Sequence, residues 1–123
     1  KRRPKPNQAE VANLVGDLKD KEVIIIDDMI DTAGTLFNAA ETAINEGAKS
    51  VIAMATHPVL SGGAIKKLKN SPISKVIVCD TIKLNENQVF DKLEIISIAD
   101  IFGESIKRIV EGTSLSSMFR DFN

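Results

Sequence analysis

The feature that most constrains this chain is a β-branched apolar run at residues 23–26 that leads directly into Asp27 and Asp28. A run without polar alternation predicts a strand buried on both faces, which is typical of parallel sheets. Similar apolar runs recur at 51–55 and 76–79, and residues 93–96 are a candidate fourth strand. Their spacing predicts an α/β fold with a doubly wound, mostly parallel sheet, whose binding chemistry lies at the carboxyl ends of the strands.

Helical signals separate these runs. Apolar residues recur with helical spacing from Leu36 until Gly47, and Thr35 or a neighbour is expected to open that helix. Further helices are predicted at 8–15, at 64–69 and at 98–111, before Gly112. The last of these carries a broad apolar stripe along one side.

Composition narrows the class of protein. The 123 residues include 16 basic and 17 acidic side chains, for a formal net charge of −1, which argues against a general nucleic-acid binder. No apolar run is long enough for a membrane span, and no secretory leader is visible. One cysteine, Cys79, cannot form an internal disulfide, which favours a reducing cytoplasm. We expect one domain, in the cytoplasm, with no partnership with nucleic acid or membrane.

The segment after the first strand combines two chemistries. The residues Asp31, Thr32, Ala33, Gly34 and Thr35 precede a helix. Small residues, threonine hydroxyls and a helix N-terminus together suit a phosphate monoester. The preceding aspartates can accept hydrogen bonds from sugar hydroxyls, or hold Mg²⁺ through water. The pattern predicts a phosphorylated sugar as ligand; the alternative is that the aspartates merely end a strand and Thr35 caps a helix.

Residues 27–35 resemble the phosphoribosyl-pyrophosphate binding loop of type I phosphoribosyltransferases and ribose-phosphate pyrophosphokinases. Further segments, at 1–4, 55–62, 79–82 and 114–119, are similar to the pyrophosphokinases in particular, so the resemblance runs along the whole chain. It implies that residues 1–123 are a C-terminal, type I phosphoribosyltransferase-like domain that is incomplete at its N-terminus.

The resemblance also implies an activity and its residues. The enzymes transfer pyrophosphate from Mg-ATP to the 1-hydroxyl of ribose 5-phosphate, giving phosphoribosyl pyrophosphate and AMP. Asp27 and Asp28 would meet the ribose hydroxyls. The 5′-phosphate would be cradled by Asp31, Thr32, Ala33, Gly34 and Thr35.

The N-terminal arm carries cations at Lys1, Arg2, Arg3 and Lys5. By resemblance it is part of a flexible catalytic loop in which Lys1 and Arg3 close over the transferring group, with Arg3 also contacting substrate. Mobile cations suit the charge that spreads in such a transfer. The alternative is a solvated basic terminus.

The C-terminal tail offers a regulatory site by the same resemblance. Ser114, Ser116 and Phe119 would help bind a phosphate or ADP effector across a subunit interface; the alternative is a solvated serine-rich tail. His57, which is the single histidine, and Cys79 are interpreted as structural residues.

The resemblance places the adenine site and most ligands of the Mg²⁺ cofactor outside this chain, and no metal ligand is assigned within it. We therefore expect the isolated chain to be inactive. The resemblance also implies that the full-length proteins form homo-oligomers, namely hexamers. Two other functions stay open: a nucleobase phosphoribosyltransferase and a non-catalytic regulatory relative of the synthetase. A response-regulator-like receiver domain is a poorer match. Its chemistry needs a further aspartate on another strand and a lysine on the last strand, and the tight turn at 31–35 does not fit it.

Overall fold

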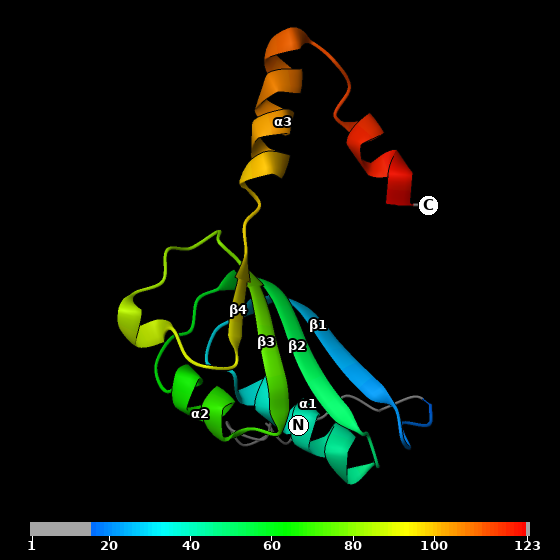
Figure 1. The fold of residues 1–123 in the computed structure, drawn as a ribbon, viewed down its shortest axis with the longest axis vertical. Coiled ribbons are helices and arrows are strands. Elements are labelled where there is room, and N and C mark those ends of the chain that lie inside the picture. The colour runs from blue at the N-terminus through cyan, green and yellow to red at the C-terminus, as the bar shows by residue number, and fades with distance from the viewer. Residues whose placement is uncertain (1–15, 123) are drawn as a thin grey trace, which may run out of the picture.

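The computed structural model describes residues 16–122 of the chain (Figure 1). The predicted helix at 8–15 and the candidate catalytic residues Lys1 and Arg3 lie outside the described residues. In chain order the elements are β1 (Glu22–Ile30), α1 (Gly34–Asn45), β2 (Ser50–Pro58), α2 (Ala64–Asn70), β3 (Ile73–Cys79), the 3₁₀ turn η1 (Glu86–Gln88), β4 (Leu93–Ile96), α3 (Ala99–Glu111) and the 3₁₀ segment η2 (Ser116–Phe122).

The four strands form one parallel sheet in the order β1-β2-β3-β4. The parallel α/β prediction is confirmed. Because right-handed crossovers that step in one direction place their helices on the same face, α1 and α2 lie together on one side of the sheet (Figure 1). In a doubly wound sheet the strand order also reverses, and within residues 16–122 the order runs in one direction only.

The core lies between the sheet and these two helices. Alternate side chains of the central strands, such as Val51, Ala53 and Val76, point toward the helices and are fully buried. They pack with Ala40 of α1 and with Leu68 of α2. Small alanines on α1 let that helix approach the sheet closely, which fixes where its N-terminus stands at the carboxyl end of β1.

The opposite face of the sheet is open in the part of the chain that the structure describes. Ile24 and Ile26 of β1 point to this face, and Ile26 is 76% exposed. The predicted burial of this strand on both faces is therefore wrong for this structure. The apolar run was read as doubly buried because it lacks alternation, yet α1 and α2 cover only one side of it.

Two strands are longer than their apolar runs. In the parallel pairing, Met29 lies beside His57 and Ile30 beside Pro58, so the ladder continues past the runs themselves. Asp27 and Asp28 therefore lie inside β1, not after it. Backbone pairing with a neighbouring strand holds polar residues extended even where the sequence signal for a strand has faded.

The last helix, α3, does not pack against the sheet. It forms where the sequence predicted, from Ala99 to Glu111, and ends at Gly112, which has φ 68°. It extends away from the sheet, beyond the carboxyl end of β4 (Figure 1). Its apolar stripe is exposed along its length, at Ile101, Phe102, Ile106, Ile109 and Val110. No helix in the described range is long and apolar enough to cross a membrane.

Candidate functional site

The predicted phosphate loop lies between β1 and α1. The helix begins at Gly34, and the residue before it, Ala33, has left-handed backbone angles, φ 60° and ψ 13°. No side chain caps the helix, so the alternative in which Thr35 is the cap is wrong: Thr35 is already the second helical residue. The left-handed turn at Ala33 brings the chain sharply from the strand into the helix.

This turn leaves backbone donors free at the start of α1. The first amide with a backbone acceptor is that of Phe37, which donates to the carbonyl of Ala33 at 3.0 Å. Within the described residues, the amides of Gly34, Thr35 and Leu36 have no backbone acceptor. Free N–H groups and the positive end of the helix dipole point out of the same loop, which is the arrangement that binds an anion.

Gly34 is not required by the fold of the free chain. Its φ is not in the left-handed region, and an added Cβ would meet only the Lys67 ammonium at 3.8 Å and the Thr32 hydroxyl at 3.9 Å. Both are ordinary van der Waals distances. A side chain at this position would instead occupy the space through which a ligand reaches the backbone amides.

A cavity of about 160 Å³ adjoins the loop. Its lining includes Asp27, Met29, Ile30, Asp31, Thr32, Ala33, Gly34, Thr35, Leu36 and Met54. Most of the sequence-predicted substrate residues are thus brought together. Asp28 is not among the lining residues. Its amide donates to the Asp27 carboxylate at 2.8 Å.

The loop is held by the segment that follows β2. The amide of Ser61 donates to the Asp31 carbonyl at 3.1 Å, and the Ser61 hydroxyl donates to the Asp31 carboxylate. The amide of Leu60 donates to the Ile30 carbonyl at 2.9 Å. Asp31 therefore anchors the loop as well as lining the cavity. The sequence analysis assigned no role to Ser61; the available signal was the turn-forming Ser-Gly-Gly segment at 61–63.

His57 is oriented by a hydrogen-bonded chain. The Thr81 hydroxyl donates to the Thr56 carbonyl at 3.2 Å and lies 2.9 Å from His57 Nδ1. The Thr81 hydroxyl therefore links the Thr56 carbonyl to the His57 imidazole. This contact ties the end of β2 to the residue that follows β3. Cys79 lies at the end of β3, as predicted, but it is only half-buried.

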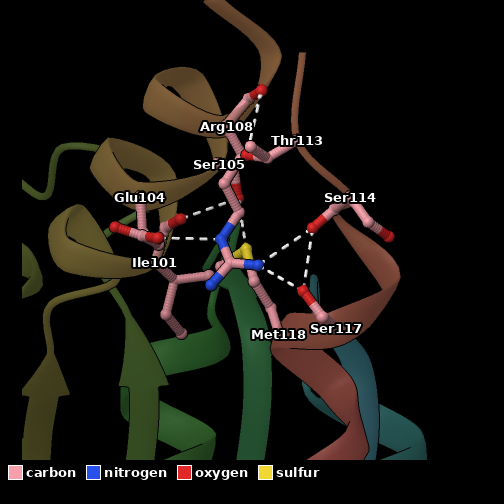
Figure 2. Close-up of polar contacts among 8 residues, drawn as sticks. All are labelled: Ile101, Glu104, Ser105, Arg108, Thr113, Ser114, Ser117 and Met118. Atoms are coloured by element: carbon pink, nitrogen blue, oxygen red, sulfur yellow. Dashed lines mark hydrogen bonds and ion pairs between the residues drawn. The ribbon is translucent and has the colours of Figure 1, made fainter. Parts of the chain in front are cut away.

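The tail folds around an arginine that the sequence interpretation missed (Figure 2). Arg108 of α3 pairs with Glu104 at 2.7 Å and donates to the Ser114 carbonyl at 2.9 Å and to the Ser117 hydroxyl. The Arg108 guanidinium lowers the pKa of Glu104 below its usual value. The i, i+4 spacing of Glu104 and Arg108 was the available signal.

The predicted regulatory residues Ser114, Ser116 and Phe119 lie in the same tail segment. The hydroxyls of Ser114 and Ser116 are 2.8 Å apart, while Phe119 is exposed. Arg108 contacts this segment through the Ser114 carbonyl and the Ser117 hydroxyl, whereas the hydroxyls of Ser114 and Ser116 contact each other. Within residues 16–122, no three His, Cys, Asp or Glu side chains are grouped so that they could hold a metal ion.

Comparison with known proteins identifies the family of this chain. The family described as the phosphoribosyl synthetase-associated domain matches residues 3–120. The chain belongs to this family. It is 58% identical to a ribose-phosphate pyrophosphokinase of Aquifex aeolicus over 119 residues, and 54% identical to that of Caldanaerobacter subterraneus subsp. tengcongensis over 119 residues.

Solved structures agree with the family. The crystal structure of phosphoribosylpyrophosphate synthetase from Mycobacterium smegmatis superposes with a TM-score of 0.78 at 41% identity, covering 80% of this chain and 33% of that one. The two pyrophosphokinases above align with 97% of this chain, which spans 38% of the length of each. The phosphoribosyl synthetase-associated fold is thus shared, over a part of the relatives' length.

Proposed function

We propose that this chain is the ribose-5-phosphate-binding part of a ribose-phosphate pyrophosphokinase, a transferase that serves nucleotide biosynthesis. The observation that carries the proposal is the loop at the N-terminus of α1. The amides of Gly34, Thr35 and Leu36 have no backbone acceptor there. The packing of the fold also does not require a glycine at position 34, because an added Cβ would make only ordinary van der Waals contacts. An anion-binding loop joined to a cavity with a carboxylate at Asp27 matches a phosphorylated sugar.

Different residues of the site are proposed to bind the phosphate and the sugar of the ligand. The amides and the Thr32 and Thr35 hydroxyls donate to the 5′-phosphate, and the Asp27 carboxylate accepts from ribose hydroxyls, which fixes the sugar relative to the strand end. Asp28 remains part of the proposed substrate site through its neighbour Asp27, whose carboxylate its amide orients. Lys1 and Arg3 are proposed to act on the transferring group.

The wider reaction extends this proposal. The names of the relatives favour a pyrophosphokinase over a nucleobase phosphoribosyltransferase, since ribose-phosphate pyrophosphokinases recur among them. ATP would supply the pyrophosphate, Mg²⁺ would enter with the ATP, and the active form would be a cytoplasmic homo-oligomer. The tail residues Ser114, Ser116 and Phe119 are proposed to contribute to an effector site for phosphate or ADP.

Titration with ribose 5-phosphate tests the proposed site. Amide signals of residues 32–35 in ¹H–¹⁵N NMR spectra are expected to shift first, because their N–H groups are the donors. Gly34→Val and Gly34→Ala are expected to weaken binding about tenfold or more, since a side chain displaces the phosphate from charge-assisted donors. Folding is expected to survive, because the added Cβ meets no close neighbour.

Gly103→Ala provides the matched control. Gly103 also lies in a helix, and an added Cβ there would meet nothing within 4 Å. The control variant is expected to bind ribose 5-phosphate like the unchanged chain. Absence of shifts at residues 32–35 would contradict the proposal, as would equal affinity of the Gly34 variants and the control.

A further inference from the structure

Lys67, on the short helix α2, reaches the phosphate loop from outside its own segment. Its ammonium donates to the carbonyl of Thr32 at 3.2 Å. The two residues are 35 positions apart, so the contact is made by the tertiary fold and not by the local motif. Packing of α2 against the core through Leu68, the next residue along, fixes the point from which Lys67 extends.

The ammonium lies on the same side of Gly34 as the Thr32 hydroxyl. A Cβ built on Gly34 would be 3.8 Å from the Lys67 ammonium and 3.9 Å from that hydroxyl. The Cα–Cβ direction of a residue in a helix tilts toward the N-terminus of that helix. The Lys67 ammonium therefore stands beside the end of α1 where the amides are free.

The positive charge of Lys67 lies beside an acidic cavity lining. The cavity lining contains the carboxylates of Asp27 and Asp31, which repel a phosphate dianion. Among the described residues, Lys67 is the cationic side chain that hydrogen-bonds to the loop. The carbonyl of Thr32 keeps the exposed lysine near the loop before any ligand arrives, which reduces the entropy lost when it meets an anion.

We propose that Lys67 is a phosphate-binding residue of this site and that it selects phosphorylated over unphosphorylated ribose. The inference rests on the proposed function and adds a residue that lies outside the loop motif. The lysine supplies a mobile point charge that offsets the neighbouring carboxylates, while the backbone amides supply fixed geometry.

Two ligands and three variants of the full 123-residue chain test this role. Affinities for ribose 5-phosphate and for ribose are measured by NMR titration on the unchanged chain and on Lys67→Ala, Lys67→Arg and Lys66→Ala. Lys67→Ala is expected to weaken ribose 5-phosphate binding about tenfold or more and to leave ribose binding unchanged. Lys67→Arg is expected to retain most of the affinity, and the effect of Lys67→Ala is expected to shrink at high salt.

Lys66→Ala is the matched control, because Lys66 is the neighbouring exposed lysine of the same helix. It is expected to bind both ligands like the unchanged chain. Equal affinity of Lys67→Ala and Lys66→Ala for ribose 5-phosphate would overturn the inference while leaving the proposed function intact. An equal loss for both ligands would also overturn it, by showing that Lys67 only supports the loop. Failure of the unchanged chain to bind ribose 5-phosphate would instead reject the proposed function, and this inference with it.

Discussion

The sheet with its two helices and the arm formed by α3 and η2 have similar apolar content but different stabilisation. In the first region apolar side chains meet, so Val51, Val76 and Leu68 are fully buried. In the second, the apolar stripe of α3 faces solvent, with Val110 81% exposed. Polar contacts define its two ends instead: Asp80 at the start and Arg108 at the tail. An amphipathic pattern predicts a helix in both places, but it predicts burial only where a partner surface exists.

The largest expected effect contrasts one apolar residue from each region. Leu68→Ala is expected to lower the free energy of unfolding by about 2–5 kcal/mol, because it leaves a cavity at a fully buried site. Phe102→Ala is expected to change it by no more than about 0.5 kcal/mol, because Phe102 is 58% exposed. Urea unfolding followed by circular dichroism measures both values.

The contrast between the two variants is itself testable. Similar losses for Leu68→Ala and Phe102→Ala would mean that the stripe of α3 is buried in solution. The comparison between the two regions would then fail, and the arm would have to be regarded as part of a packed core.

A smaller effect is expected where Arg108 joins the tail to α3. Arg108→Met keeps the aliphatic stem but removes the hydrogen bonds to the Ser114 carbonyl and the Ser117 hydroxyl. Faster amide hydrogen exchange is expected at residues 114–119, with a change in global stability below about 1 kcal/mol. Lys107→Met, one residue earlier on the exposed helix, should leave exchange in the tail unchanged. Unchanged exchange in Arg108→Met would show that the tail is held by other contacts.

The smallest effect concerns the start of α3 and depends on pH. Hydrogen bonds from the Ser97 hydroxyl and the Ile98 amide lower the pKa of Asp80 below its ordinary value of 3.8. A depressed folded-state pKa means that the contribution to stability is present above pH 3.8 and is lost as the pH falls through the lower, folded-state value. The first turn of α3 is therefore expected to loosen only below pH 3.8.

Amide chemical shifts of Ile98 and its neighbours, followed down the pH scale, measure this transition. Asp80→Asn is the control, because its side-chain oxygen still accepts a hydrogen bond but does not titrate there. The transition should be missing from the control. If the control shows the same acid transition, Asp80 does not cause it.

The sequence predicted the local elements well, for reasons that differ by element. The helix of residues 99–111 and the start of α1 next to Thr35 follow from apolar spacing and glycine positions, which are local properties. The resemblance of residues 27–35 predicted the candidate site as one contiguous segment, and the structure gathers most of it around one cavity. The extension of β1 through Asp27 and Asp28 was missed, since it depends on pairing with β2.

The residues that support the site could not be read from its motif. Ser61 and Lys67 contact the loop from 30 and 35 positions away, and no local pattern specifies which side chain crosses such a distance. Arg108 was overlooked in a similar way, because its partners in the tail are set by how the chain turns back after Gly112.

By itself, the sequence determined the order of strands and helices, the parallel α/β class and the phosphate-suited loop, because each depends on residues near one another in the chain. The tertiary structure decided which faces are buried, which aspartate lines the cavity and which lysine reaches Thr32. Burial and charge placement depend on partners brought together by the fold, and a one-dimensional pattern carries no distances between them.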